Sequence, residues 1–478
     1  MLGLIQKVIV VVLLSFYIAG CQPNNNNVAP KAKYVFLFIG DGMGIQQVNA
    51  AQAYKMALDS SVGNANLSFT QFPATGFVTT FSGSRYITCS AAAGTAIASG
   101  TKTSIGTIGL NANHIDSLFS VAHNLNNTGF QIGLVTSVSI DHATPAAFYA
   151  HQPDRDMYHE IGHDLIKSNF RFFASGGLKD TLGKKSKNPL GNVIELGKQK
   201  GFLFTSNISV SEQDLSKYKS IVYSAPNSAP AKSLQYAIDA QPTDITLGQL
   251  TQMGIDVLNN PKGFFMMVEG GKIDWACHDN DAATTIQDVY HFSDAVQKAV
   301  DFYNMHPNET LIIITADHET GGMSIGTREH GYESNIALLK NQKVSQEKFD
   351  FLLKSLIKEK NGKPSFSEVL SLIQLHIGLG NKGLELTAEE INKLKDAYNF
   401  KFNSKVKFDN GNEDYSNYYT ISNQAIAILN KKAGIGWTSY SHTGSPVPIY
   451  ALGVGHEQFI GQFDNTQIAP KIVKIMGL

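Results

Sequence analysis

One pattern recurs along this chain, first in Tyr34-Val35-Phe36-Leu37-Phe38-Ile39-Gly40-Asp41-Gly42-Met43-Gly44. Six apolar residues in a row predict a strand that is buried on both faces, as in a parallel sheet. Glycines on both sides of Asp41 then let the backbone and a ligand approach its carboxylate closely. In parallel α/β sheets, binding sites form at the carboxyl ends of the strands. Asp41 is therefore a candidate metal ligand.

A second apolar run covers 263–268 and ends at Glu269. Asp274 and His278 follow four residues apart, and residues at i and i+4 share one face of a helix. That spacing lets a carboxylate oxygen and an imidazole nitrogen converge on one zinc ion, which accepts both kinds of ligand. This segment therefore supplies three further candidate ligands.

The third run, 310–315, leads into Asp317 and His318. Charged groups at the end of a buried strand need a partner or a metal ion, so both residues are candidate ligands. His442 precedes the last predicted strand, 447–452. A lone histidine in such a position is more often structural, so His442 becomes a candidate only in combination with the others.

The strand predicted at 132–138 leads into His142 and Thr144, with Arg155 further along the chain. The hydroxyl of Thr144 suits a hard cation, which prefers oxygen ligands. The planar guanidinium of Arg155 can bind two phosphate oxygens at once. Taken alone, Arg155 reads as a solvated surface residue; beside the candidate ligands it predicts an anion site.

A helix start is predicted in Ile87-Thr88-Cys89-Ser90-Ala91-Ala92-Ala93-Gly94-Thr95-Ala96. The first N–H groups of a helix lack intrahelical partners and carry partial positive charge. A phosphoryl group that arrives at Ser90 would therefore meet donors that already point toward it. Ser90 is a candidate nucleophile, although a buried packing helix also explains this segment when it is read alone.

In this order the segments resemble the alkaline phosphatase family, from about Tyr34 to the C-terminus. Ser90 matches the phosphorylated nucleophile of the family, and Arg155, eleven residues after Thr144, matches its phosphate-binding arginine. The resemblance implies two zinc ions and one magnesium ion per chain. The implied ligands are Asp274, His278 and His442 for one zinc, Asp41, Asp317 and His318 for the second, and Asp41, Thr144 and Glu269 for magnesium, with Ser90 also facing the metals.

The chemistry of that family explains why these residue types are needed. Two zinc ions about 4 Å apart can hold the attacking and leaving oxygens of an in-line displacement at phosphorus. Zinc would lower the pKa of the Ser90 hydroxyl, and Arg155 would stabilise the charge that spreads over the non-bridging oxygens. An oxygen-ligated magnesium ion can hold the base that takes the serine proton.

Three positions depart from the family pattern. Cys89 stands where many relatives have an aspartate that could orient Arg155. His142 stands where some bacterial relatives have an aspartate near the magnesium, and Trp275 stands where relatives often have Lys or His near the phosphate. Both His142 and Trp275 are expected to lie just behind the direct ligands, which are all retained. We expect weak retention of magnesium because a neutral imidazole replaces a carboxylate there.

The predicted strands alternate with helical patterns at 46–58, 90–99, 117–125, 245–258 and 286–303. This alternation predicts an α/β fold, a three-layer α/β/α sandwich with a largely parallel central sheet. The interval 324–438 differs, with helical patterns at 346–358 and 365–375. Because it separates His318 from His442, it is expected to be a crown-like or lid-like insertion between two parts of a catalytic core, 33–323 and 439–478.

Composition favours an ordinary globular protein with a large core. The chain has 478 residues, of which 43% are hydrophobic and 17% charged, and its formal net charge is −1. This balance gives no reason to expect a nucleic-acid partner. Of the three cysteines, Cys89 and Cys277 lie beside candidate site residues, and the sequence leaves open whether they form a disulfide.

The N-terminus predicts export. Lys7 and the short apolar run 8–17 are typical of a signal peptide, here assigned to 1–20. Residues 18–21, Ile-Ala-Gly-Cys, resemble a bacterial lipoprotein processing box, which would leave a lipid on Cys21 and a polar tether over 21–32. The protein is thus expected to be a periplasmic or outer-membrane lipoprotein, with plain secretion as the alternative.

The sequence as a whole predicts an alkaline phosphatase that hydrolyses small phosphate monoesters through a phosphoserine at Ser90. The first alternative is a phosphodiesterase or sulfatase on the same scaffold. The second is a surface lipoprotein that binds phosphate without catalysis, although such a protein would be expected to have lost ligands. A homodimer is a further expectation from the resemblance.

Overall fold

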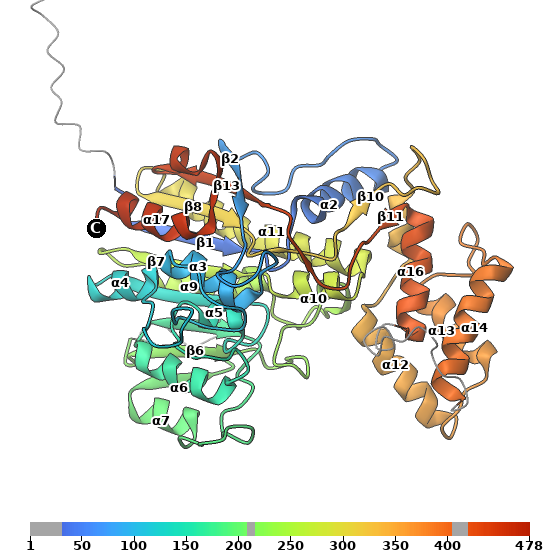
Figure 1. Cartoon of the computed structure of the whole chain (residues 1–478), viewed down its shortest axis with the longest axis horizontal. Helices are drawn as coiled ribbons and strands as arrows, with labels where there is room; N and C mark the ends of the chain where they lie inside the picture. The colour runs from blue at the N-terminus through green and yellow to red at the C-terminus, as the bar shows by residue number, and fades with distance from the viewer. Residues whose placement is uncertain (1–30, 208–215, 404–418) are drawn as a thin grey trace, which may run out of the picture.

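The computed structural model of the chain describes residues 31–207, 216–403 and 419–478 (Figure 1). The predicted signal peptide, the lipidation site Cys21 and almost all of the tether lie outside these described residues. Within the described ranges, no helix combines the length and the apolar character that a membrane span requires.

The centre of the molecule is a ten-stranded sheet in the order β14-β2-β13-β8-β1-β7-β3-β4-β6-β5. Every neighbouring pair is parallel except that β13 runs antiparallel to both β2 and β8. The predicted largely parallel sheet is thus confirmed. Its strands are β1 Tyr34–Ile39, β2 Ala74–Thr79, β3 Gln131–Thr136, β4 Phe172–Ser175, β5 Phe202–Thr205, β6 Ser220–Ser224, β7 Phe264–Glu269, β8 Thr310–Thr315, β13 Val447–Gly453 and β14 Gly461–Asp464.

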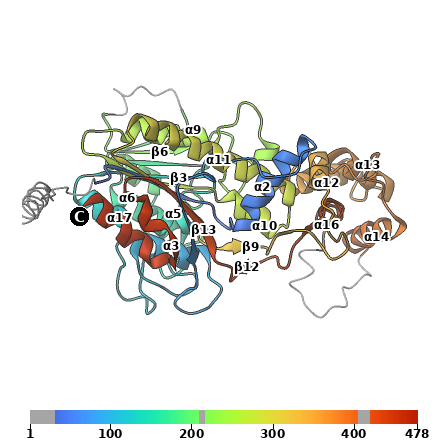
Figure 2. The same ribbon diagram turned by 90° about the horizontal axis from the view of Figure 1, so that it is seen from above.

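Helices cover both faces of this sheet, as the predicted three-layer sandwich requires. Figure 2 shows α9 and α11 on one side of the sheet and α3, α5 and α17 on the other. The helices of the core are α2 Ile45–Leu58, α3 Ser90–Ser99, α4 Val121–Asn127, α5 Ala143–Ala146, α6 Tyr158–Ser168, α7 Val193–Gln199, α9 Leu247–Leu258, α10 Lys272–His278, α11 Ala282–Met305 and α17 Ile468–Met476, with 3-10 turns η1 Ala237–Asp239, η3 His456–Phe459 and η4 Asn465–Gln467.

The register of the central strands brings their carboxyl ends to one level. Ile39, the last residue of β1, pairs with Glu269 of β7 on one side and with Thr315 of β8 on the other. Asp41 and Asp317 lie two residues beyond these ends. The sheet therefore delivers three carboxylates to the same edge, where parallel α/β folds place their binding sites.

Two glycines allow the close packing that this edge needs. Gly42 has φ +71, and a Cβ atom there would lie 2.8 Å from the Cα atom of Asp274. A Cβ atom on Gly94 of α3 would lie 3.1 Å from that of Ala147, next to α5. Any larger residue would push α10 or α5 away from the end of the sheet.

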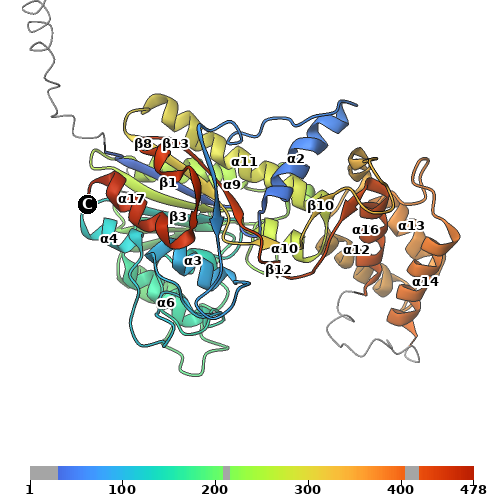
Figure 3. The same ribbon diagram turned by 45° about the horizontal axis from the view of Figure 1, so that its top comes forward.

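The interval 324–438 forms a group of helices beyond one end of the sheet, drawn in orange in Figure 1. Its elements are η2 Ile336–Asn341, α12 Gln346–Glu359, α13 Phe366–His376, α14 Ala388–Phe402 and α16 Ile421–Ala433. The chain leaves through β10 (Ser324–Ile325) and returns through β11 (Ile435–Gly436), which pair antiparallel. Figures 2 and 3 both place α10 and β12 (His442–Thr443) between these helices and the sheet.

Some predicted boundaries differ from the observed ones, and three of these differences have a clear local cause. The helix predicted at 117–125 begins only at Val121, because the Ser120 side chain caps it by accepting the His123 N–H. The strand predicted at 132–138 ends at Thr136, whose hydroxyl accepts the N–H of Val138 and turns the chain. Helix α11 is longer than the predicted 286–303, because its first turn is capped by the Asp281 side chain.

Candidate metal centre

Three histidines and Asp274 meet at the carboxyl end of the sheet. The Nε2 atoms of His278 and His442 are 3.2 Å apart, and they lie 3.4 and 3.7 Å from carboxylate oxygens of Asp274. The ring of His318 stacks on that of His442 with 3.5 Å between the ring centroids. Asp274, His318 and His442 offer ligand atoms that all lie within 4.8 Å of one another.

Each of these histidines is held by its other ring nitrogen. Nδ1 of His278 lies 2.6 Å from the carbonyl oxygen of Tyr440, and Nδ1 of His442 lies 2.8 Å from that of Thr88. A carbonyl only accepts, so Nδ1 of each ring carries a proton and Nε2 is the nitrogen that is left to face a metal ion. This is the arrangement that metal-bound histidines use to fix their tautomer. Nδ1 of His318 is 3.2 Å from the Thr320 hydroxyl.

A second group consists of Asp41, Asp317 and His318 at the ends of β1 and β8. His318 Nε2 lies 3.5 Å from an oxygen of Asp41 and 3.3 Å from one of Asp317. All three side chains are fully buried, and together they offer ligand atoms within 4.8 Å. Asp317 uses one carboxylate oxygen to accept the N–H groups of Gly42 and of His318. Its other oxygen faces Nε2 of His318.

The third group lies on the other side of Asp41. Asp41, His142 and Glu269 offer ligand atoms within 4.8 Å of one another, and all are buried. One oxygen of Glu269 accepts the Thr136 hydroxyl, while the other lies 3.9 Å from Nδ1 of His142. The buried hydroxyl of Thr144 has no hydrogen-bond partner among the described residues. The sequence predicted Thr144 as a ligand of this group and His142 just behind it, whereas the structure brings His142 itself within reach of Asp41 and Glu269.

The oxygen atoms of these groups explain why cations fit. Both oxygens of Asp41, one of Glu269, one of Asp317 and the hydroxyl of Thr144 are buried without a hydrogen-bond partner in the described part of the chain. Buried polar atoms are almost always paired, because an unpaired one costs about 1–3 kcal/mol. Five such atoms at one sheet edge therefore indicate bound cations, and their oxygen and imidazole chemistry suits zinc and magnesium.

The pKa values of Asp41 and Asp317 also indicate that this site needs added positive charge. Burial raises the pKa of Asp41 well above its usual range, and the neighbouring carboxylates of Asp317 and Asp274 raise it further. Burial, with Asp274 nearby, raises the pKa of Asp317 to about 7. Burial also lowers the pKa of His318 well below its usual value, which leaves the imidazole neutral and able to bind a metal. Carboxylates this close need added positive charge to be ionised together.

Ser90 is the first residue of α3 and is buried beside the ligand groups. Its Oγ atom lies 3.3 Å from Nε2 of His318. The residue before it, Cys89, has extended backbone, so the N–H groups of the first helical turn point out of the helix end at Ser90. The predicted nucleophile and the predicted ligands thus come together at one place.

Arg155 also reaches this place, and the structure shows what positions it. One guanidinium nitrogen of Arg155 lies 3.1 Å from Nε2 of His142, and the backbone N–H of Arg155 donates to the carbonyl of Gly106. His142 therefore takes over the orientation that an aspartate at position 89 would have supplied. The ring of Trp275 lies edge-on to that of His142, with 5.9 Å between the centroids.

Sequence reasoning missed the threonines and the acid that support the ligands. Thr320 donates a 2.6 Å hydrogen bond to Asp274, and Thr136 donates to Glu269. The buried Glu319 accepts from the amide of Gln47 and from the hydroxyl of Thr443, next to His442. The one available signal was the position of Glu319 and Thr320 directly after Asp317 and His318. Cys89 and Cys277, whose pairing the sequence left open, are both free.

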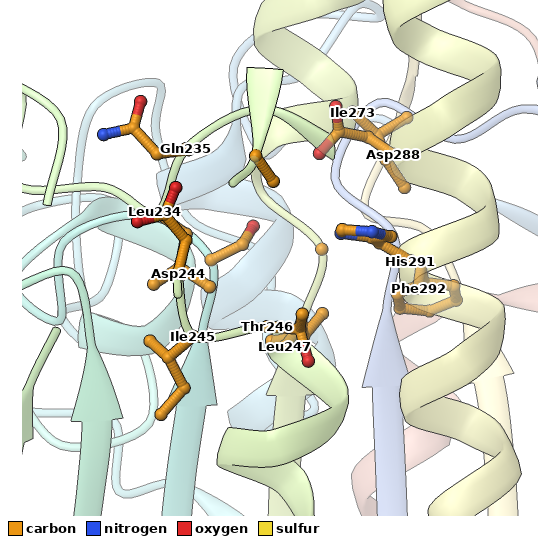
Figure 4. Close-up of a pocket in the computed structure, with 13 residues that line it drawn as sticks. Leu234, Gln235, Asp244, Ile245, Thr246, Leu247, Ile273, Asp288, His291 and Phe292 are labelled. Atoms are coloured by element: carbon orange, nitrogen blue, oxygen red, sulfur yellow. The ribbon is translucent and has the colours of Figure 1, made fainter. Parts of the chain in front are cut away.

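Two cavities lie near this centre. A pocket of about 610 Å³ is lined by Arg85, Tyr86, Ile87, Thr88, Cys89, Ile105, His278, Ser441 and His442. A much smaller cavity of about 20 Å³, room for about one water molecule, lies between Leu234, Asp244 and Ile245 on one side and Asp288 and His291 of α11 on the other (Figure 4). None of the candidate ligands lines the small cavity. Of the two, the large pocket is the one that borders the metal centre.

Comparison with known families identifies this arrangement. The sequence model of the family described as Alkaline phosphatase matches residues 32–188 and 229–478. The chain belongs to the alkaline phosphatase family. Alkaline phosphatase 4 of Bacillus subtilis (strain 168) is 33% identical over 452 residues, which cover 92% of this chain and 88% of the relative. Alkaline phosphatase 3 of the same organism is 30% identical and covers 96% and 92%.

Solved structures of alkaline phosphatases share the fold. The cold-active alkaline phosphatase of the psychrophile Shewanella sp. superposes with a TM-score of 0.74 at 26% identity, over 93% of this chain and all of that one. The Thermus thermophilus alkaline phosphatase gives the same TM-score at 24% identity, over 96% of each chain. A third neighbour, a histidine-to-aspartate variant of the TAB5 alkaline phosphatase, has a TM-score of 0.65 at 24% identity over 94% and 99%, and is described with Mg bound in its M3 site.

Membership in the family makes this chain an enzyme, a phosphomonoesterase of the hydrolase class. Its substrates are accordingly phosphate monoesters. The groups of candidate ligands around Asp41, Asp274 and His318 agree with a metal-dependent member of the family.

Proposed function

We propose that this protein is an alkaline phosphatase that hydrolyses phosphate monoesters in two steps through a phosphoserine at Ser90. The observation that carries the proposal is the convergence, around Ser90, of buried carboxylate oxygens without partners and imidazole Nε2 atoms that are left to face a metal ion. A protein that had kept only the fold would be expected to have lost some of these groups. The three groups of possible ligands share Asp41 and His318, which supports this reading.

Two zinc ions and one magnesium ion fit the observed groups. Asp274, His278 and His442 would hold the first zinc, and Asp41, Asp317 and His318 would hold the second. Asp41, Thr144 and Glu269 would hold the magnesium, with His142 as their neighbour, and the magnesium reported in the M3 site of the TAB5 variant supports such a third site. When bound, these ions supply Lewis-acid stabilisation of the attacking and leaving oxygens.

The residues of this chain then divide the reaction between them. Ser90 attacks phosphorus through Oγ, a P–O bond forms to the serine, and the bond to the alcohol breaks. In the second step water attacks the phosphoserine, phosphate leaves, and the Ser90 hydroxyl is restored. In both steps Arg155 binds non-bridging oxygens and stabilises the charge that develops on them. His142 holds the guanidinium in place at 3.1 Å.

A direct test compares the wild-type protein with Ser90→Ala. We expect the wild type to hydrolyse an aryl phosphate monoester far faster than the matching diester or sulfate, and to lose this activity on chelation. Quenching in acid with ³²P-labelled monoester should place the label on a peptide that contains Ser90. Label on another residue, or full activity in Ser90→Ala, would contradict the nucleophile. Equal rates on the monoester and the diester would favour a phosphodiesterase.

We propose from the sequence alone that the protein is exported and anchored through a lipid on Cys21, in the periplasm or at the outer membrane. Cys21→Ser should then move the protein from the detergent phase to the aqueous phase without loss of phosphatase activity. A homodimer is proposed as well, and sedimentation of the purified protein tests it. We further propose that 324–438 is an insertion between the two parts of the catalytic core. The antiparallel pair β10–β11, where the chain leaves and returns, supports this division.

A further inference from the structure

The large pocket beside the metal centre has a chemistry of its own. Its wall includes Tyr86, Ile87 and Ile105, whose side chains are 75%, 47% and 37% exposed. Large apolar side chains that share one hollow and remain this accessible are typical of a surface that binds a ligand. The pocket therefore offers apolar contact next to a site otherwise made of charged groups.

The tyrosine ring in this pocket is held in place by the backbone beneath it. A Cβ atom on Gly444 would lie 2.6 Å from Cε1 of Tyr86, so the ring rests against the chain just before β13. Thr88, two residues further on, accepts a hydrogen bond from His442 through its carbonyl. The wall of the pocket and a candidate zinc ligand are thus joined by the short segment from Tyr86 to Thr88.

The charge of the pocket is one-sided. The Arg85 guanidinium is exposed and makes no hydrogen bond or ion pair with any residue in the described ranges. No aspartate or glutamate lines the pocket, and the other titratable residues in its wall are Tyr86, Cys89, His278 and His442. A cation without an acidic partner, in the same pocket as an aromatic ring, favours a flat ligand group that carries negative charge.

We propose that this pocket binds the alcohol part of the substrate and selects phosphate monoesters of aromatic alcohols that carry an acidic substituent. The proposal rests on the phosphomonoesterase function proposed above. With the phosphoryl group at Ser90 and Arg155, the alcohol part extends into the hollow that borders His278 and His442. There the aromatic ring contacts Tyr86, Ile87 and Ile105, and its acidic substituent meets Arg85.

The first experiment measures kcat/KM of the metal-loaded enzyme for phenyl phosphate and glycerol phosphate. Tyr86→Ala should lower kcat/KM for phenyl phosphate by about 3- to 10-fold, the scale of one aromatic contact, and leave glycerol phosphate unchanged. Hydrolysis of the phosphoserine is common to all substrates, so kcat should change less than KM wherever that step limits the rate. Tyr86→Phe keeps the ring and should keep the preference. Tyr332→Ala, at a fully exposed tyrosine outside the pocket, is the matched control.

The second experiment tests the charge. Arg85→Gln should lower kcat/KM for 4-carboxyphenyl phosphate by about two- to fivefold, the scale of an exposed ion pair, and spare phenyl phosphate. The effect should shrink as salt rises. The matched control is Arg328→Gln, at an exposed arginine far along the chain.

A binding measurement separates this proposal from the proposed function. Calorimetry should show that phenylphosphonate binds the metal-loaded protein more tightly than methylphosphonate, and that Tyr86→Ala removes the difference. This readout needs no turnover, so it decides the pocket even if the protein hydrolysed no monoester. Equal losses on phenyl and glycerol phosphates in Tyr86→Ala, or no difference between the two phosphonates, would overturn the proposal.

Discussion

At the scale of single residues, His142 connects two parts of the site, because it faces both Arg155 and Glu269. Burial lowers the pKa of His142, so the imidazole is neutral and Nε2 can accept from the guanidinium. The anion-binding arginine and the predicted magnesium ligands therefore share one side chain. A substitution of Arg155 is therefore expected to affect the predicted magnesium ligands, and a substitution among those ligands is expected to affect Arg155.

Arg155→Ala should weaken monoester turnover and phosphate inhibition by about 2–4 kcal/mol, the scale for removing a charged donor from a transition state. Diesters should lose less, since they present one fewer charged oxygen. The informative quantity is the ratio of kcat/KM for a matched monoester and diester. Arg171→Ala, at an arginine directly before β4 that donates to the carbonyl of Tyr218, serves as a control. Equal losses on both substrates would mean that Arg155 acts through the fold.

Asp288, in the small cavity of Figure 4, predicts a pH dependence of stability. Burial raises its pKa to about 7 although Lys272 nearby lowers it in part. The folded protein thus holds this proton more tightly than the unfolded chain does, so stability falls as pH rises from about 4 through 7. Ionisation costs up to about 4 kcal/mol.

Asp288→Asn should remove this dependence. Between pH 5 and pH 9 the melting temperature of Asp288→Asn should rise relative to that of the wild type. The melting temperature of Asp294→Asn, at an exposed position of the same helix, should change with pH as that of the wild type does. A constant difference between wild type and Asp288→Asn over that range would contradict the assignment.

Most of the candidate site residues could be singled out from the sequence because they follow a recognisable strand end or helix start. Asp41 and Asp317 come after apolar runs whose parallel pairing could be inferred from the pattern. The contact between His142 and Arg155 could not be inferred from the pattern, since it depends on how α5 turns after β3. The supporting roles of Glu319 and Thr320 could not be inferred either, because these residues contact parts of the chain hundreds of positions away, such as Gln47.

At the scale of elements, the helices of the insertion are fixed to the core through α10 and the turn before α11. Lys272 of α10 is buried, lies 3.5 Å from Glu347 of α12, and has the Tyr236 ring 3.3 Å away. Gln342 donates to both carboxylate oxygens of Asp281, at 2.8 and 2.9 Å. These contacts meet the helix that carries Asp274 and His278.

Glu347→Gln should destabilise the protein by about 1–3 kcal/mol, because it takes from the buried Lys272 ammonium the acidic side chain that lies 3.5 Å away. Glu359→Gln, at an exposed pair near the other end of α12, is the matched control and should change little. Thermal melts of both variants measure the difference. The double change Lys272→Met and Glu347→Gln should recover part of the loss; if it does not, the two side chains do not act as a pair.

Element boundaries were less predictable than element types. The caps Ser120 and Asp281 decide where α4 and α11 begin, and neither stands out from the many polar residues around it. The short strands β4, β5 and β6 were not singled out, because four or five residues in a row carry little periodic signal. Their places in the sheet come from tertiary pairing.

At the scale of the whole molecule, the metal ions are expected to support the fold as well as the reaction. Removing them with a chelator leaves the carboxylates of Asp41, Glu269 and Asp317 buried side by side without compensating charge, whereas Asp274 keeps His278 as a partner. A ligand present at 1,000 times its dissociation constant stabilises the folded state by about 4 kcal/mol. We therefore expect a clear drop in melting temperature on chelation, which zinc and magnesium together reverse.

Asp41→Asn is the matching control, since Asp41 lies in two of the three ligand groups. Its melting temperature should depend less on chelation than that of the wild type. If elemental analysis showed the ions removed while the wild-type melting temperature stayed constant, the buried carboxylates would have to be balanced by protonation alone.

The bond from His442 to the Thr88 carbonyl joins residues 354 positions apart. A ribosome has therefore made more than nine tenths of the polypeptide before His442, the last of the proposed zinc ligands, exists. Until then, a nascent chain holds Ser90, Arg155 and most of the carboxylates but has no complete centre. Premature release yields a protein without phosphatase activity. Phosphatase activity is therefore expected only from chains whose synthesis has passed His442.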